Sequence, residues 1–149
     1  MSKSDMLIKN TLDQFLKNKK YVEENQLKEI QRVRNNEGGG WAGHFVDSGS
    51  LSENELLKLI IDETRLPYLP ILDVTPPDNL LKEFTLDFMK AFECFPVDKI
   101  GNILTIATPN PFQAELFRCR ATKDCMIKIF VCRVSEWREK IRLISQNNK

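Results

Sequence analysis

Apolar residues in the N-terminal part of the chain recur at the three- and four-residue spacing of amphipathic helices. This spacing predicts helices over residues 4–20, 23–35, 41–47 and 52–65. Ser4 is the expected N-cap of the first helix, and Ser52 with Glu55 forms a capping box at the start of the last. The glycine run Gly38–Gly40 interrupts the pattern between the second and third helices. The chain is therefore predicted to begin with two helix pairs.

The two helix pairs are similar in sequence. The segment Val22–Ile30 is echoed by Leu51–Leu59, at an offset of 29 residues. Apolar residues stay in register at this offset, in the pairs Leu12 and Trp41, Leu16 and Phe45, Val22 and Leu51, Leu27 and Leu56, and Ile30 and Leu59. Self-similarity at a fixed period indicates that one helical unit was used twice. We expect each copy to bury its apolar face against the other.

A proline-rich segment follows the helices. Four of the eleven residues from 67 to 77 are proline, which excludes a regular helix and favours an extended chain. We expect Tyr68, Leu69 and Ile71 to hold this segment against the helices, as a docked linker between two halves.

Helix and strand signals alternate after the linker. Helices are predicted over 78–84, 85–92, 112–121 and 135–144, and strands over 95–100, 103–107 and 126–133. Gly101 and Asn102 form a two-residue hairpin turn between the first two strands. Ser135 is the expected N-cap of the final helix, whose inward residues are Trp137, Ile141 and Ile144.

These patterns predict an α+β fold in three parts. A helical repeat of two helix pairs occupies residues 1–66, the linker residues 67–77, and an α+β subdomain residues 78–149. The last part is a small three-stranded sheet with helices packed on one face.

Composition excludes several classes of protein. A chain of 149 residues with 42% hydrophobic and 29% charged residues is typical of a soluble globular protein of one domain or two small ones. The 22 basic and 21 acidic residues nearly cancel, so no nucleic-acid partner is expected. The one dense basic run, Lys17–Lys20, lies at a helix end, where the helix dipole favours positive charge.

Location and thiol chemistry follow from what the chain lacks. No apolar stretch approaches the roughly 20 residues of a membrane-spanning helix, and the N-terminus has no signal-peptide core. We expect a cytoplasmic protein without direct membrane insertion. The four cysteines are Cys94, Cys119, Cys125 and Cys132. They contain no Cys-x-x-Cys pair, so we expect reduced thiols and no metal site.

The sequence shows no catalytic machinery. No Gly-Lys pair occurs, so the phosphate-binding loop of nucleotide hydrolases is absent. His44 is the only histidine and has no ligand-spaced partners, and the serines near Gly49 do not form a nucleophile elbow. We therefore expect a protein that is not an enzyme, with no catalytic residues.

Several segments resemble the N-terminal domain of type II secretion ATPases (protein E) and of related type IV pilus assembly ATPases. The stretches Gly49–Leu56 and Thr64–Ile71 carry the resemblance, and the second contains Arg65-Leu-Pro-Tyr68, which is similar to the Gly-Leu-Pro-Tyr turn of that family. Asn102–Pro111 is similar to its strand-to-helix turn, and the resemblance extends over about residues 7–144. It implies a cytoplasmic module in front of a hexameric motor whose phosphate loop lies outside this chain.

The resemblance also implies two roles. Such modules dock the motor onto the cytoplasmic domain of an inner-membrane partner, and some bind cyclic di-GMP through two tandem motifs of the form R-L-G-x-x-L-x-x-x-G-x-I-x-x-x-x-L. By position, Gly40 and Ala42 replace the arginine and first glycine of the second motif copy. Thr11, Asp13 and Lys20 replace the arginine and both glycines of the first copy. The candidate residues of this degenerate dinucleotide site are Leu12, Leu16, Val22, Leu27, Trp41, Ala42, Phe45, Gly49, Leu51 and Leu56.

The missing arginines decide the order of the hypotheses. A doubly charged dinucleotide loses its main polar and stacking anchors without them, although Trp41 offers a ring that either stacks on a base or packs in the core. The leading hypothesis is a non-catalytic docking or regulatory domain without a cofactor, peripheral at the inner membrane. Its expected partners are the cytoplasmic part of an inner-membrane secretion or pilus protein and, if fused, the ATPase motor domain. The alternatives are a cyclic di-GMP-sensing domain that controls the motor and a standalone regulatory module.

Overall fold

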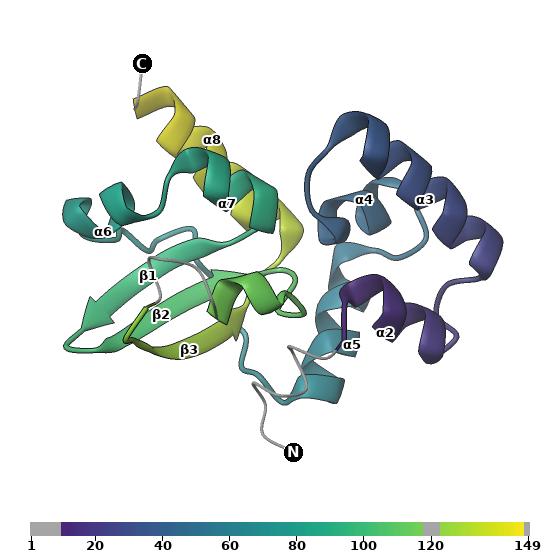
Figure 1. Cartoon of the computed structure of the whole chain (residues 1–149), viewed down its shortest axis with the longest axis horizontal. Helices are drawn as coiled ribbons and strands as arrows, with labels where there is room; N and C mark the ends of the chain where they lie inside the picture. The colour runs from purple at the N-terminus through teal and green to yellow at the C-terminus, as the bar shows by residue number, and fades with distance from the viewer. Residues whose placement is uncertain (1–9, 118–122, 148–149) are drawn as a thin grey trace.

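The computed structural model describes residues 10–117 and 123–147, which form a helical half and a sheet half side by side (Figure 1). The helices of the helical half are α2 (Leu12–Asn18), α3 (Glu24–Glu37), α4 (Trp41–Asp47) and α5 (Glu53–Thr64). α4 begins and ends 29 residues after α2, and α5 begins 29 residues after α3. The two helix pairs thus repeat at the offset read from the sequence. The N-cap of α2 is Thr11, whereas the predicted cap Ser4 lies outside the described residues.

Local side chains close the N-termini of three of these four helices. The Gln26 side chain accepts a hydrogen bond from the backbone N–H of Glu23 before α3, at 3.0 Å. Ser52 and Glu55 form the predicted capping box of α5, and a similar box precedes α2. α4 is the exception, because its N-cap residue Gly40 has no side chain. Its first-turn N–H groups need an acceptor from elsewhere.

The apolar faces of both helix pairs meet in one core. Its buried members are Leu12, Phe15, Leu16, Val22, Ile30, Ala42, Phe45, Leu51, Leu56, Ile60, Leu66, Phe112, Ile129, Val131 and Val134. The last four residues belong to the sheet half, so the two halves share buried apolar surface. Such burial is the main favourable term that keeps the halves in contact.

The sheet half contains a mixed three-stranded sheet in the order β1-β2-β3. Its strands are β1 (Phe95–Ile100), β2 (Ile103–Thr108) and β3 (Met126–Val131). β1 and β2 form the predicted antiparallel hairpin around Gly101 and Asn102, while β3 runs parallel to β2. A register shift between Pro96 and Asp98 bends the edge strand.

Three helices cover one face of this sheet, as predicted (Figure 1). They are α6 (Asp78–Glu83), α7 (Leu86–Phe92) and α8 (Val134–Asn147). The buried residues beneath them are Ile71, Leu80, Phe84, Met89, Cys94, Phe95, Leu104, Ile106, Ala107, Leu116, Cys132, Trp137 and Ile141. Trp137 and Ile141 face inward, and Ile144 is partly buried, as the periodicity predicted. The predicted α+β class is confirmed.

The proline-rich segment packs against the sheet, which corrects the expectation that it is held against the helices. Tyr68 pairs with Val131 at the free edge of β3. The backbone N–H of Leu69 donates to Val131 O at 3.0 Å, and the N–H of Val131 donates to Pro67 O at 2.9 Å. Ile71 is fully buried in the core of the sheet half. The segment therefore covers an edge that would otherwise expose unpaired backbone groups.

The predicted helix over 112–121 is wrong in its described part, where a short 3₁₀ helix spans Ala114–Phe117. Phe112 is buried in the core of the helical half and Leu116 in that of the sheet half. Residues four apart on an α-helix lie on one face, so a regular helix does not place these two side chains in different cores. The Asn110 side chain also accepts from the N–H of Phe112, at 3.0 Å, and holds a turn there. Residues 118–121 lie outside the described residues.

Ser135 is not the N-cap of the last helix. α8 begins one residue earlier, at Val134, and the Glu136 carboxylate accepts from the backbone N–H of Arg133, at 2.9 Å. The N–H and hydroxyl of Ser135 instead donate to Glu53 on α5, each at 3.0 Å. A carboxylate from the other half thus accepts from a first-turn N–H group that a local capping side chain would otherwise satisfy.

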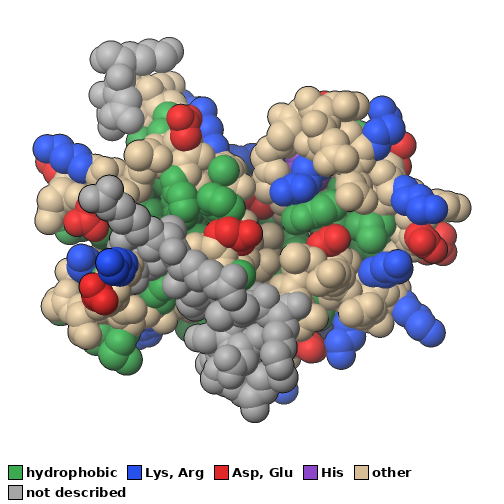
Figure 2. Space-filling view, viewed as in Figure 1, with side chains coloured by type: hydrophobic (Ala, Val, Ile, Leu, Met, Phe, Trp, Pro, Cys, Tyr) green, Lys and Arg blue, Asp and Glu red, His purple; other side chains and the backbone are tan. Residues whose placement is uncertain are grey.

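The described surface carries mixed charge. On the face shown in Figure 2, Lys and Arg side chains are interspersed with Asp and Glu side chains.

Among the described residues, none of the helices has both the length and the hydropathy that crossing a bilayer requires. The described cysteines Cys94, Cys125 and Cys132 form no disulfide bond with one another, and Cys119 lies outside the described residues.

Candidate functional site

The structure brings the candidate dinucleotide residues together, but mostly inside the core of the helical half. Those that are buried are Leu12, Leu16, Val22, Ala42, Phe45, Leu51 and Leu56. Leu27 and Trp41 are partly buried against the same core, and Gly49 lies in an exposed turn. Helix packing therefore accounts for most of the apolar positions that the two motif copies retain.

The turn after the first helix of each pair contains a residue with positive φ at the same position in both copies. Gly49 has a φ of 79°, and Lys20, at the equivalent position, has a φ of 64°. A non-glycine residue in this left-handed region costs roughly 1–2 kcal/mol. The first copy therefore keeps the turn without the glycine that the motif expects.

An arginine does lie near the second motif copy, although sequence position did not reveal it. The guanidinium carbon of Arg34, on α3, lies 4.6 Å from the centre of the Trp41 ring. Its Nε donates to the carbonyl of Gly39 at 3.1 Å. This cation–π contact places a guanidinium beside Gly40, where the motif has its arginine. The only sequence signal was an arginine shortly before the glycine run.

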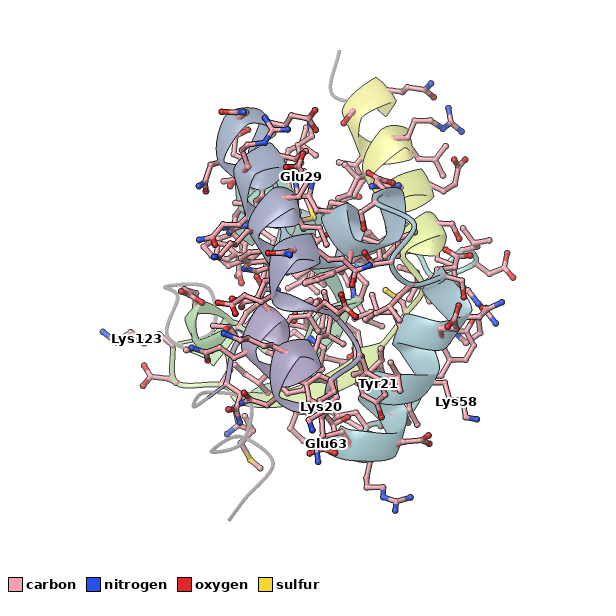
Figure 3. The ribbon with its side chains drawn as sticks, turned by 90° about the vertical axis from the view of Figure 1, so that its right-hand side faces the viewer. Lys20, Tyr21, Glu29, Lys58, Glu63 and Lys123 are labelled. Carbon is pink, nitrogen blue, oxygen red and sulfur yellow. The ribbon has the colours of Figure 1, made fainter. Side chains whose placement is uncertain are left out.

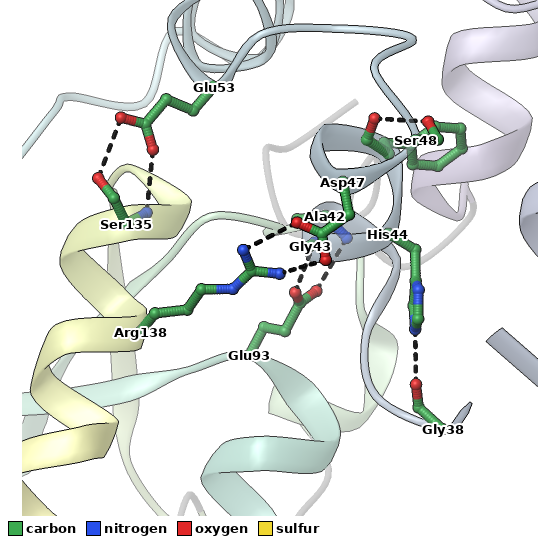
Figure 4. A network of polar contacts seen from close by, with 11 residues as sticks. Gly38, Ala42, Gly43, His44, Asp47, Ser48, Glu53, Glu93, Ser135 and Arg138 are labelled. Atoms are coloured by element: carbon green, nitrogen blue, oxygen red, sulfur yellow. Dashed lines mark hydrogen bonds and ion pairs between the residues drawn. The ribbon is translucent and has the colours of Figure 1, made fainter. Parts of the chain in front are cut away.

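A carboxylate from the sheet half caps α4, as Figure 4 shows. The Glu93 carboxylate accepts hydrogen bonds from the backbone N–H groups of Ala42, at 2.9 Å, and Gly43, at 2.8 Å. These are the first-turn donors that Gly40 leaves without a local acceptor. Glu93 is 2% exposed. We call Glu93, its two N–H donors and the ion pair described below the Glu93 clasp.

The clasp requires glycine on α4. A Cβ atom at Gly40 would lie 2.2 Å from Glu93 Oε1, and its three nearest neighbours are all atoms of the Glu93 side chain. A Cβ atom at Gly43 would lie 2.8 Å from Arg138 Nη2 and 3.1 Å from Glu93 Oε2. Both glycines thus permit a close approach of the carboxylate and guanidinium to the helix backbone.

One backbone conformation and two hydrogen bonds position Glu93. It ends α7 in the left-handed region, with a φ of 45°. Its carbonyl accepts a hydrogen bond from Thr108 Oγ1 at 2.7 Å. The next carbonyl, that of Cys94, accepts from Trp137 Nε1 at 3.0 Å. Elements β2, α7 and α8 together aim the side chain across the boundary between the halves.

Burial and the neighbouring donors and charges act in opposite directions on the pKa of Glu93. Burial raises the pKa of Glu93, while the two N–H donors and the charges of Arg138 and His44 act against that shift. Arg138, on α8, also forms a two-pronged ion pair with Asp47 on α4, at 2.9 and 2.8 Å. The hydrogen bond to Asp47 raises the pKa of Arg138. The sheet half therefore holds α4 at both its N-terminal and its C-terminal turn.

A groove opens between α3 and α4. It has a volume of about 370 Å³ and is lined by Glu29, Ile30, Val33, Glu37, His44, Asp47 and Ser48. Ile30 and Val33 supply its apolar wall, while carboxylates stand around it. Glu29 faces outward on the side of the molecule shown in Figure 3.

The polar groups of the groove differ in their partners. Glu29 pairs with Arg32 and Asp47 with Arg138, whereas Glu37 forms no ion pair with any described residue. His44 Nε2 lies 2.6 Å from the carbonyl oxygen of Gly38. Because a carbonyl only accepts, this nitrogen carries a proton. Within residues 10–117 and 123–147, no group of His, Cys, Asp and Glu side chains is arranged to hold a metal ion.

Comparison with known proteins gives the family. The model of the MshEN domain matches residues 64–147, more than half of the chain. The chain belongs to the MshEN domain family. The matched part of this MshEN domain contains the linker, the sheet half and Glu93.

Solved structures share the fold over nearly the whole chain. The N-terminal domain of XpsE is 18% identical, with a TM-score of 0.60, and 95% of each chain is covered. Another crystal form of that domain is 19% identical, with a TM-score of 0.59, and covers 85% of this chain and 89% of its own. A structure of MshE with cdg is 17% identical, with a TM-score of 0.55, and covers 90% of this chain and 98% of its own. No curated protein matches the sequence. The predicted resemblance to the N-terminal domains of secretion and pilus ATPases is confirmed by the family and the fold.

Proposed function

We propose that this MshEN domain is a non-catalytic docking and regulatory module of a secretion or pilus assembly ATPase. It binds the cytoplasmic part of an inner-membrane component of the same system. Membership of the MshEN family supports the setting. The observation that carries the docking role is the groove between α3 and α4 on the helical half.

The groove fits a protein segment of definite chemistry. Val33, which is half-buried, offers apolar contact, and the unpaired carboxylate of Glu37 adds negative charge at one end. A partner helix that presents apolar side chains flanked by Lys or Arg matches this arrangement in shape and charge. The apolar part supplies affinity, while the charges favour a basic partner over an acidic one.

Calorimetry with the purified cytoplasmic domain of the cognate inner-membrane component tests the proposal. We expect binding by the wild-type chain and a loss of tenfold or more, about 1.4 kcal/mol, in Glu37→Lys. Asp62→Lys is the matched control, because Asp62 is an exposed acid on α5 that does not line the groove. Absence of binding at roughly 100 μM would refute the docking role. Equal losses in both variants would assign the effect to net charge and not to the groove.

A cyclic di-GMP sensor is the second candidate, and the stacking of Arg34 on Trp41 favours it. In this arrangement Arg34 supplies a guanidinium to the second motif copy, although the first copy has Thr11 at the arginine position. Calorimetry with cyclic di-GMP, on the wild type and on Arg34→Ala, tests it. Binding that Arg34→Ala removes would support a sensor, and no binding by the wild type would reject it.

A further inference from the structure

Gly40, Gly43 and Glu93 have no role in the docking groove, yet the three residues fit one another. Glu93 reaches 51 positions back along the chain to Ala42 and places one carboxylate oxygen on each of two successive N–H groups. Gly40 leaves room for that carboxylate, and Gly43 leaves room for the guanidinium of Arg138 beside it. The absence of a side chain at Gly40 and Gly43 and the burial of the Glu93 carboxylate thus account for one another.

We infer that the Glu93 clasp is a built-in latch, which holds the helical half on the sheet half in one arrangement without any ligand. The chain's own carboxylate occupies the start of the second motif copy, where the resemblance expects an arginine. The module therefore transmits a fixed geometry to its partners and is not switched by a small molecule at this position.

Sterics make the latch and the motif arginine mutually exclusive. Any side chain at position 40 begins with a Cβ atom that meets Glu93 Oε1, Cδ and Cγ at 2.2 to 2.4 Å. An arginine at this position would force the Glu93 side chain to move. A side chain at position 40 and the Glu93 carboxylate therefore compete for the same space.

Among the described residues, three other polar contacts between the halves join the Glu93 carboxylate, which makes four links. Arg138 holds Asp47, and Glu53 accepts from the N–H and hydroxyl of Ser135. Arg133 Nε donates to Asn54 Oδ1 at 2.8 Å. Those three links lie on exposed side chains, where water competes for the same groups. Glu93 alone among the four is almost completely buried, so water does not replace its acceptor oxygens while the halves are closed.

The alternative is that Glu93 only caps α4 and does not control the arrangement of the halves. Both accounts predict a frayed α4 in Glu93→Ala. They differ in whether the orientation of one half relative to the other changes. Residual dipolar couplings measure the orientation of each half separately. Hydrogen exchange at the Ala42 and Gly43 amides reports the cap itself.

The test compares the full chain with Glu93→Ala, Glu93→Gln and the control Glu83→Gln, an exposed acid of the sheet half. We expect one set of couplings to fit both halves of the wild type and of the control. In Glu93→Ala, the Ala42 and Gly43 amides should exchange at least about tenfold faster, and the two halves should require separate alignment tensors. Glu93→Gln keeps the side-chain size but has one acceptor oxygen, so its exchange rates and couplings should lie between those of the wild type and Glu93→Ala. It replaces Glu93→Ala in the test if that variant does not fold. Unchanged couplings between the halves in both Glu93 variants would overturn the latch, as would a rearrangement of the wild-type halves when cyclic di-GMP is added. Neither result depends on whether the α3–α4 groove binds a partner.

Discussion

A single methyl group should report whether Glu93 and Gly40 are coupled. Gly40→Ala places a Cβ atom 2.2 Å from Glu93 Oε1, and every one of its three nearest atoms belongs to Glu93. The backbone at Gly40 has a φ of −89° and a ψ of 165°, which alanine adopts without strain. The substitution is therefore unfavourable only through Glu93 and through the preference for glycine over alanine at an N-cap, which is worth about 1 kcal/mol.

The expected energies follow from these contacts. In the wild type, displacing the carboxylate leaves two N–H groups without their acceptor, at about 1–3 kcal/mol for a buried group. The overpacking itself costs a similar 1–3 kcal/mol when it is not relieved. We expect Gly40→Ala to lower the free energy of unfolding by about 2–3 kcal/mol. In a Glu93→Ala background the clash is gone, and the same substitution should cost about 1 kcal/mol or less.

Urea denaturation of the four chains, followed by far-UV circular dichroism, measures the coupling. The midpoint gives the stability of each chain, provided that the dependence on urea stays the same across the set. We expect a coupling energy of about 2 kcal/mol between the two positions, within the range for residues in contact. Equal effects of Gly40→Ala in both backgrounds would contradict the reasoning, because the clash would then not involve Glu93.

Three further predictions test other contacts. Phe112→Ala should destabilise the chain by about 3–5 kcal/mol in urea denaturation, because its ring stacks in the core that the halves share; a loss below 1 kcal/mol would contradict that placement. Burial and the Glu136 carboxylate raise the pKa of Tyr68, so its phenol should ionise later than a free tyrosine in a 295 nm absorbance titration, and Tyr68→Phe should remove that step. The pKa of Tyr68 is higher in the folded chain than in the unfolded chain. The contribution of the neutral Tyr68 phenol to the free energy of unfolding is therefore present below the ordinary tyrosine pKa and is lost as pH rises through the folded pKa. Asp47→Ala should cost about 1 kcal/mol or less in urea denaturation, because its ion pair with Arg138 is exposed to water; a loss above 2 kcal/mol would show that the pair matters more than its exposure suggests.

The features that the sequence determined by itself are those that depend on residues close together in the chain. The capping box of Ser52 and Glu55 closes over three residues, and the hairpin at Gly101 and Asn102 over two. The apolar spacing gave the bounds of α4 correctly, because it reports which face of a short helix is buried. The family could also be inferred from the sequence, since the turns that are typical of it are short local motifs.

The tertiary structure decided the contacts that join distant parts of the chain. Phe112 and Leu116 enter different cores, which replaces a predicted helix with a 3₁₀ turn. Glu93, which lies 51 residues after Ala42 in the sequence, caps α4. Arg34 on α3 contacts the Trp41 ring. Local periodicity carries no information on such pairs, because hydrogen bonds and steric fit between separate elements arise only once the elements pack. The sequence by itself therefore determined a repeated helical frame and its family, while packing decided that a carboxylate closes the second copy of that frame.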